Sequence, residues 1–309
     1  MGKRSGMPNI SRAGQRALER YLKHLSGAED LSLPTLRNYG SDLRHFMAWC
    51  EASWSEGQAA MTAFAPAQVT TSTLTQYRSF LKTTLRLKPS SINRHLVSLK
   101  RYFAWAAETK LVTLDPARVV KLVPRVAQAP RHLSDREEHA LVVAVTTAAD
   151  LRDRTIILLL LHTGLRAREL CRLQRDHLSI GQRSGLLKVY GKGNKYREVP
   201  LNATARTALQ AYFAQHKSES HYLFPSGKTG GALTERALGH LIKKYATQAK
   251  LPDVSPHNLR HRFGYRMAEA VPLHRLAQIM GHNSLDTTMI YIRATQSDLQ
   301  KEVEKIAWV

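Results

Sequence analysis

A proline-containing stretch without apolar periodicity divides this chain of 309 residues into two helix-rich parts. The stretch reads LVPRVAQAPRHLS at residues 122–134, and its prolines cannot continue a helix. We therefore expect a helical domain over residues 1–122, a linker over 123–133 and a second domain over 134–309. Two domains also agree with the length of the chain.

Apolar residues of the first domain recur every three or four positions, which is the spacing of one face of a helix. Such stripes run through residues 17–25, 39–47 and 74–81. Ser32 followed by Pro34 is a start signal for the second of these helices. The first domain is therefore expected to be helical.

The most regular stripe runs from Ile92 to Ala106, and we expect its helix to begin after the cap pair Ser90 and Ser91. Four side chains lie off this stripe, on a face that is either solvated or in contact with phosphates: Arg94, His95, Lys100 and Arg101. The basic composition of the chain favours phosphate contact.

The second domain opens with Ser134 as a helix cap and Glu137 at the capping-box position. It is helical except for an extended segment at 186–190, a glycine-rich turn and another extended segment at 196–201. This pattern predicts a β-hairpin. The expected fold class is mainly α with a small β-sheet or hairpin.

The charge of the chain predicts a polyanionic partner. Its formal net charge is +22, from 46 Lys and Arg against 24 Asp and Glu. Residues 1–120 hold 17 basic and 8 acidic side chains, and residues 121–309 hold 29 and 16. Because both parts are basic, the polymer is expected to touch both, as in a clamp.

The remaining composition indicates a soluble, cytoplasmic protein. Cys50 and Cys171 stand in helical contexts and fit small packing positions better than a disulfide or a metal site. Residues 1–16 are polar and charged, unlike a signal peptide, and the longest apolar run, Ile156–Leu161, is too short to span a bilayer.

Two short segments combine basic side chains with turns. In TGLRAREL the glycine ends an apolar helix, Arg166 follows where a new helix begins, and Glu169 lies three residues later on the same face. In the turn GKGNK, Lys192 stands between glycines that let the backbone approach a ligand. Taken singly, a surface ion pair better explains the first segment, and a solvated turn lysine explains the second equally well.

A third segment, SPHNLRH, begins a helix after Ser255 and Pro256. His257, Arg260 and His261 share one face of its first turns. That face is cationic and close to the positive end of the helix dipole, where an anion would be held. A core histidine is the alternative for His261.

The segment MGHNSLDTTMIYIR places His282 nine residues before Tyr291. Taken singly, Tyr291 is expected to be a core aromatic because apolar residues surround it. The segments together supply arginines, a lysine, histidines and a phenol, without a carboxylate cluster for magnesium. Such a set suits phosphodiester transfer without metal or cofactor. Each donor that stabilises the charged phosphate is worth about 3 kcal/mol. Tyrosine can attack the phosphorus, and lysine can protonate the leaving oxygen.

At these residues the sequence resembles the tyrosine recombinases, or phage integrase family, and in particular their compact bacterial Xer-like and transposon-type members. Four segments carry the resemblance in the order of the family: TGLRAREL, GKGNKYREVPL, SPHNLRHRF and IMGHNSLDTTMIYI. The segment RFGYRMAEA departs from the small and hydroxyl residues usual in the family, which is a change in packing.

The resemblance implies a role for each matching residue: Arg166 and Arg260 clamp the scissile phosphate, Lys192 protonates the leaving 5′ oxygen, His257 is the general acid or base for the tyrosine proton, His282 hydrogen-bonds the phosphate, and Tyr291 is the nucleophile. Glu169 is expected to support the pocket, and His261 to be structural. No metal and no cofactor are implied.

The resemblance also implies an assembly. The segments LSLPTLRNYGSDLRHFMAWC and SSINRHLVSLKRYFAWAAE are similar to the helical, SAM-like core-binding domain, which with the mixed α/β catalytic domain forms a C-shaped clamp on double-stranded DNA. Four protomers would act on two DNA sites through a 3′-phosphotyrosyl bond and a Holliday junction, for integration, excision or resolution. The last segment, SDLQKEVEKIAWV, would dock on a neighbouring protomer, and Lys243 and Lys244 are further candidates for DNA contact.

Three alternatives stay open at this stage. A metal-dependent nuclease could use His257, His261 and His282 as ligands, although Arg260 stands among them without a nearby carboxylate. An architectural DNA clamp would bind without catalysis. A type IB topoisomerase or telomere resolvase would keep the cleavage chemistry without exchanging strands.

Overall fold

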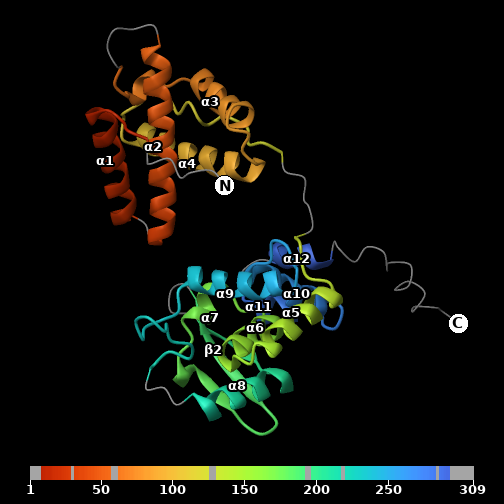
Figure 1. Ribbon diagram of the computed structural model, residues 1–309. Helices are drawn as coiled ribbons and strands as arrows, with labels where there is room; N and C mark the ends of the chain where they lie inside the picture. The colour runs from red at the N-terminus through yellow and green to blue at the C-terminus, as the bar shows by residue number, and fades with distance from the viewer. Residues whose placement is uncertain are drawn as a thin grey trace, which may run out of the picture. The chain divides into compact units, whose positions relative to one another are not determined.

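The computed structural model of the chain describes residues 8–28, 31–56, 62–124, 130–191, 196–216, 220–282 and 285–292. The chain forms two compact units, Met1–Ala127 and Gln128–Val309, whose boundary falls inside the stretch expected to be a linker (Figure 1). No helix in the described part of the chain is long and apolar enough to cross a membrane.

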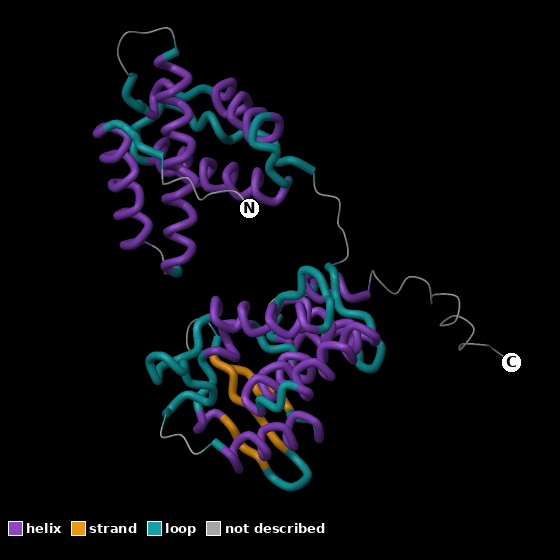
Figure 2. Tube along the Cα trace, in the orientation of Figure 1, coloured by secondary structure: helices purple, strands orange, loops and turns teal. Residues whose placement is uncertain are grey.

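The first unit is helical, as predicted (Figure 2). Its elements are α1 (Arg12–Ala28), α2 (Leu33–Ser55), the short 3₁₀ helix η1 (Pro66–Gln68), α3 (Thr71–Thr83) and α4 (Pro89–Glu108). Ser32 caps α2 by accepting a hydrogen bond from the Thr35 N–H, which confirms the predicted start. Fully buried aromatic side chains from these helices fill the core: Tyr21, Phe46, Tyr77, Tyr102 and Phe103.

The predicted start of α4 was wrong by a few residues. The helix begins at Pro89, with Lys88 at the cap position and no side-chain cap, so Ser90 and Ser91 lie inside its first turn. Proline suits this position because its fixed φ is already helical and the missing N–H would have had no helical partner. The prolyl residue therefore sets the start of the helix in place of a serine hydroxyl.

His95 was also wrongly placed on the exposed face of α4. Its side chain is buried, and its Nδ1 lies 3.2 Å from the Tyr77 hydroxyl, which in turn lies 2.7 Å from Nδ1 of His45. Nε2 of His95 lies 3.5 Å from the buried carboxylate of Asp42. Burial, with the neighbouring charge of Arg94, lowers the pKa of His95 to about 4.

The second unit combines helices with one small sheet. The helices are α5 (Asp135–Thr147), α6 (Leu151–Thr163), α7 (Ala167–Cys171), α8 (Ala203–Gln215), α9 (Glu235–Gln248), α10 (Pro256–Ala268), α11 (Leu273–Met280) and α12 (Asp286–Ile292), with the 3₁₀ turn η2 (Arg175–His177). The Ser134 and Glu137 side chains form the predicted capping box of α5.

The predicted hairpin is present as β2 (Gly185–Tyr190) and β3 (Tyr196–Pro200), which pair antiparallel with Val189 opposite Arg197. A third strand, β1 (Leu178–Ile180), pairs antiparallel with β2 and gives the sheet order β1-β2-β3. β1 was not predicted, because three residues are too few to show an alternating pattern.

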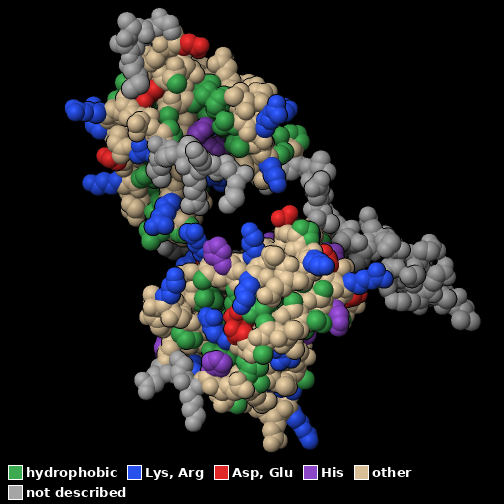
Figure 3. All heavy atoms as spheres, in the orientation of Figure 1, with side chains coloured by type: hydrophobic (Ala, Val, Ile, Leu, Met, Phe, Trp, Pro, Cys, Tyr) green, Lys and Arg blue, Asp and Glu red, His purple; other side chains and the backbone are tan. Residues whose placement is uncertain are grey.

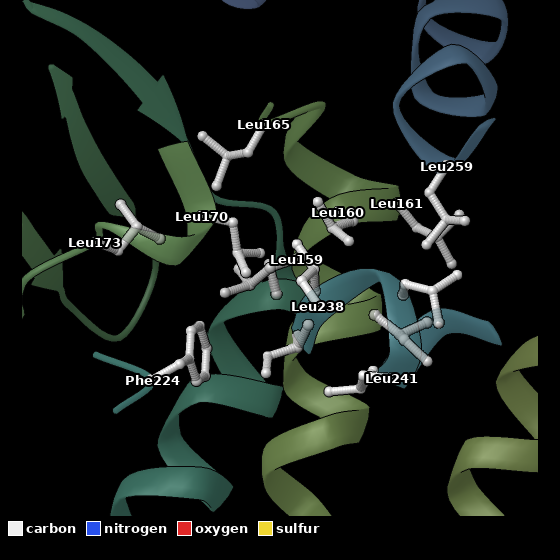
Figure 4. Close-up of a cluster of buried hydrophobic side chains, with 14 of the residues drawn as sticks. Leu159, Leu160, Leu161, Leu165, Leu170, Leu173, Phe224, Leu238, Leu241 and Leu259 are labelled. Carbon is white, nitrogen blue, oxygen red and sulfur yellow. The ribbon is translucent and has the colours of Figure 1, made fainter. Parts of the chain in front are cut away.

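The core of the second unit surrounds α6. Its run Ile156–Leu161 is buried because six successive apolar residues cover every face of a helix, and α6 packs against α5, α8 and α10. Figure 4 shows Leu159 and Leu160 facing Leu238 and other apolar side chains of the surrounding elements. Cys171 and, in the first unit, Cys50 are buried free thiols, as predicted.

A smaller apolar cluster joins α10, α11 and α12, which pack on one another, and α11 also contacts β3 (Figure 1). Its buried members are Phe263, Tyr265, Leu276, Met280 and Tyr291. This cluster brings the ends of the candidate segments, which lie far apart in the sequence, to one place.

Candidate active site

Arg166 lies at the turn between α6 and α7. Gly164 ends α6 in the left-handed region, at φ +61°, so that the chain turns and Arg166 becomes the cap residue of α7. The carboxylate of Glu169 accepts the Arg166 backbone N–H at 2.7 Å and its Nη1 at 2.8 Å. The Arg166 side chain is 45% exposed, and its Nη2 donates to the Gly281 carbonyl at 2.8 Å.

Arg260, on α10, is buried and points to the same place. Its guanidinium donates to the carbonyls of Gly164 and Met280, the latter at 2.8 Å, and its Nη2 lies 2.9 Å from Nε2 of His282. Burial and the charge of Arg166 lower the pKa of Arg260 to about 10. The two guanidinium groups are thus held close enough to repel each other.

The contacts of His282 define which of its nitrogens carries the proton. Because an arginine can only donate, Nε2 facing Arg260 is an acceptor, and Nδ1 then carries the proton and donates to Oγ1 of Thr288 at 2.7 Å. Burial, with the charges of Arg260 and Arg166, lowers the pKa of His282 to about 4. The ring is therefore neutral at pH 7.

His257 and His261 lie one turn apart on α10, with ring centroids 4.2 Å apart. His257 is exposed, and burial with the charge of Arg260 lowers its pKa. His261 is buried, with a pKa lowered to about 4 by burial and the neighbouring His257. Nδ1 of His261 lies 3.1 Å from the hydroxyl of Tyr291, so His261, and not His257, meets the phenol.

Tyr291 is 1% exposed. Its ring meets Tyr265 edge to face at 5.2 Å and lies parallel to His282 at 6.4 Å. A Cβ on Gly264 would lie 2.5 Å from Cζ of Tyr291, so glycine at this position provides the space for the ring. Burial raises the pKa of Tyr291 to about 12, against the opposing effect of Arg260, and the phenol is protonated at neutral pH.

Known proteins similar to this chain identify its family. Residues 131–298 match the Phage integrase family, and residues 18–110 match the Phage integrase N-terminal SAM-like domain. The tyrosine recombinase XerC of Xanthomonas campestris pv. campestris (strain B100) is 33% identical over 295 residues, which cover 92% of this chain and 86% of that protein. The chain belongs to the phage integrase family of tyrosine recombinases.

Other tyrosine recombinases give the same result. XerD of Shewanella oneidensis is 30% identical over 298 residues, covering 92% of this chain and 94% of that protein. Two solved structures share the fold. XerH bound to palindromic difH substrate, a post-cleavage complex, has a TM-score of 0.72 at 20% identity and covers 96% of this chain and 84% of that chain. The Tn1549 transposon integrase in complex with circular intermediate DNA has a TM-score of 0.69 at 20% identity, covering 89% and 94%.

These matches confirm the family, the mainly helical fold class and the enzyme class predicted from the sequence. The chain is a site-specific recombinase, an enzyme that cleaves and rejoins DNA. Within the described residues, no group of three or more His, Cys, Asp or Glu side chains is placed to hold a metal ion.

The tyrosine recombinase fold brings seven of the predicted site residues together: Arg166, Glu169, His257, Arg260, His261, His282 and Tyr291. Lys192 lies outside the described residues. Two residues of this site were not predicted: Arg197 on β3 and Thr288 on α12. Arg197 follows the turn GKGNK, but a single arginine in a strand does not indicate which residue it will bind.

The side chains of the first unit that were predicted to contact DNA also bind other residues of that unit. Arg94 pairs with Asp42 at 2.7 Å, Lys100 donates to the carbonyls of Ala117 and Arg118 at 2.6 and 3.0 Å, and Arg101 lies over the ring of Tyr39. In the second unit Lys243 is exposed, and Lys244 donates to the Tyr245 hydroxyl at 3.1 Å. Lys and Arg side chains stand on the visible faces of both units (Figure 3).

Proposed function

We propose that the cluster around the end of α11 is the strand-cleavage site and that Tyr291 is its nucleophile. The carrying observation is the convergence of Arg166, Arg260 and His282, which come from α7, α10 and the end of α11, beside the phenol of Tyr291. Guanidinium groups suit a phosphate because their paired N–H donors match two of its oxygens.

The charge of the cluster supports an anionic ligand. Among the described residues, Glu169 is the one carboxylate hydrogen-bonded to Arg166, and it is shared with Arg197. In the described part of the chain, Arg260 donates only to carbonyl oxygens and to neutral His282. The site therefore carries uncompensated positive charge, and a phosphate would remove the repulsion between its arginines.

In the proposed reaction, the oxygen of Tyr291 attacks the scissile phosphorus. The bond from phosphorus to the 5′ oxygen breaks, leaving a 3′-phosphotyrosyl bond and a free 5′-hydroxyl. The proton of the phenol passes to His257, and Lys192 donates a proton to the leaving oxygen. Attack by the 5′-hydroxyl of a partner strand reverses these steps, so the bond energy is conserved.

Tyr291 must move before it can attack. Its hydroxyl now meets His261 in a buried site, whereas His257 is exposed. His282 must also exchange its acceptor contact with Arg260 for a protonated contact with phosphate, and the negative charge of DNA favours that protonation. DNA binding is therefore proposed to complete the site.

The proposed partner is double-stranded DNA held by both units as a clamp, with four protomers joining two sites through a Holliday junction. The segment at residues 297–309, proposed to dock on a neighbouring protomer, lies outside the described residues. Support for DNA as the partner comes from the family and from the basic charge of both parts of the chain.

The test uses nicked duplexes carrying candidate sites from DNA next to the gene, in which the nick traps the covalent adduct. Wild-type protein should form an adduct that denaturing gels resolve, and Tyr291→Phe should bind the same DNA without forming it. Tyr265→Phe is the matched control, since Tyr265 packs on Tyr291 and donates only to the Pro130 carbonyl. An adduct formed by Tyr291→Phe would refute the assignment.

A further inference from the structure

Three successive carbonyl groups at the end of α11 each accept a hydrogen bond from a different arginine. The pairs are Ile279 with Nε of Arg197 at 2.9 Å, Met280 with Nη2 of Arg260 at 2.8 Å, and Gly281 with Nη2 of Arg166 at 2.8 Å. The last carbonyls of a helix lack helical partners and form the negative end of its dipole, so they suit cations. Arg166 and Arg260 are proposed to hold the scissile phosphate, whereas Arg197 has no role in the reaction described above.

Arg197 connects this helix end to Glu169. Its side chain is 14% exposed, and its two terminal nitrogens donate to the two carboxylate oxygens of Glu169 at 2.8 and 2.9 Å. The same carboxylate accepts both the backbone N–H and the guanidinium of Arg166. Arg197 therefore holds Arg166 through one intermediate residue and contacts the carbonyl next to the one that holds Arg260.

Electrostatics make Glu169 dependent on Arg197. Burial alone would raise the pKa of Glu169, but the hydrogen bonds and charge of Arg197, with the contacts of Arg166, lower it to about 2. Without Arg197 the carboxylate would lose two charge-assisted bonds while staying buried. A weakened Glu169 would hold Arg166 less firmly.

Sterics fix Arg197 and the helix end together. Gly281 has φ +66°, and a Cβ there would lie 2.8 Å from both Cδ and Nη1 of Arg197. The arginine stem thus packs directly against the backbone that leads to His282.

We infer that Arg197 is a positioning residue for strand cleavage: it fixes Glu169 and the end of α11 so that Arg166 and Arg260 are already oriented when the phosphate arrives. This inference rests on the roles proposed above for these two arginines. Its consequence is that losing Arg197 slows the step in which charge on the phosphate is stabilised, while DNA binding is retained.

The experiment compares Arg197→Gln and Arg197→Lys with wild type in single-turnover adduct formation on the nicked duplex. One duplex has an ordinary scissile phosphate, and the other has a methylphosphonate there, which lacks the negative charge that the arginines stabilise. Arg197→Gln should slow adduct formation by about 100-fold on the phosphate, and the loss should be several-fold smaller on the methylphosphonate. Arg197→Lys keeps the positive charge but lacks the planar guanidinium. Its rate of adduct formation should lie between the rates of wild type and Arg197→Gln.

Arg206→Gln is the matched control, because Arg206 is also partly buried and donates to a carbonyl, that of Leu201, on the α8 side of the unit. It should match wild type on both duplexes. Mobility shifts measure DNA binding, which should stay within a few-fold of wild type for every variant. In addition, Glu169→Gln combined with Arg197→Gln should cost little more than Glu169→Gln alone, since that change already removes the charge that holds Arg197.

Equal losses for Arg197→Gln on the two duplexes, an unchanged rate on the phosphate, or additive effects of the Glu169 and Arg197 changes would each overturn the inference. If Arg197→Gln does not fold, the duplex comparison with Arg197→Lys decides in the same way. Failure of the proposed function looks different, because wild type would then form no adduct, or Tyr291→Phe would form one.

Discussion

At the scale of single residues, the clearest finding is the contrast between Tyr291 and its surroundings. The sequence allowed two interpretations, core aromatic or nucleophile, and the structure shows a ring that is buried in an apolar cluster yet has its hydroxyl against His261 and its face toward His282. Glycine at position 264 makes this placement possible. The side chain proposed as the nucleophile thus lies in a packed site.

Gly264→Ala should therefore destabilise the second unit. The added Cβ would overlap the ring of Tyr291, and overpacking of this kind costs about 1–3 kcal/mol in the free energy of unfolding. Urea denaturation measures the change. In a Tyr291→Ala background, where the ring is absent, the same glycine substitution should cost much less, and an unchanged cost would show that Tyr291 does not lie against Gly264.

At the scale of secondary structure, sequence patterns predicted the features that depend on contacts between residues close in sequence. The capping box of α5, the start of α2, the Arg166–Glu169 contact over three residues and the hairpin were all readable because each depends on residues close in sequence. The contact between Arg197 and Glu169 spans 28 residues, and that between Arg260 and His282 spans 22. No periodicity in the sequence encodes such pairs. The candidate site residues could therefore be named from a family resemblance, but the contacts among them, and the place of Arg197, could not be predicted.

The end of α11 organises three arginines, and Gly281→Ala should disturb all of them. Alanine is disfavoured at φ +66°, and its Cβ would press on Arg197. We expect a loss of about 1–3 kcal/mol in the free energy of unfolding and adduct formation slowed by about tenfold or more. Gly239→Ala in α9 is the control, since within the described residues no atom beyond the adjoining helix backbone lies within 4 Å of its added Cβ, and it should retain wild-type cleavage. Normal cleavage by Gly281→Ala would contradict the organising role of this helix end.

At the scale of the whole molecule, both units hold buried or half-buried histidines that are neutral in the folded protein at pH 7. The pKa is lowered to about 4 for His95 in the first unit and for His261 and His282 in the second, from the ordinary value of 6.5. The unfolded chain binds protons below pH 6.5 that the folded chain rejects until pH 4. The stability contributed by these groups is therefore fully present above pH 6.5 and is lost as the pH falls toward 4.

Urea denaturation at pH 7, 6 and 5 should show this loss, at about 1.4 kcal/mol per pH unit for each proton taken up on unfolding. The window is informative because Glu169 has a pKa of about 2 when folded and 4.5 ordinarily. Its contribution to stability is present above pH 4.5 and is lost mainly below this window. Burial raises the pKa of Asp42, which opposes the effect in the first unit. His261→Asn should reduce the pH dependence of the second unit, and equal stability at pH 7 and pH 5 would contradict the assigned neutral histidines.

The lysines that give the chain its basic charge are of two kinds, and the salt dependence of DNA affinity can distinguish them. Lys243 is exposed on α9, whereas both hydrogen bonds of Lys100 go to carbonyls of the first unit, those of Ala117 and Arg118. If Lys243 neutralises a phosphate, Lys243→Ala should make the plot of log affinity against log salt less steep by about 0.9, because one fewer counterion is released. Lys100→Ala should leave that slope unchanged and instead lower the stability of the first unit by about 1 kcal/mol, since two hydrogen bonds to carbonyls, one of them part-buried, are lost. A slope reduced equally by both substitutions would place Lys100 on the DNA, in spite of its contacts within the unit.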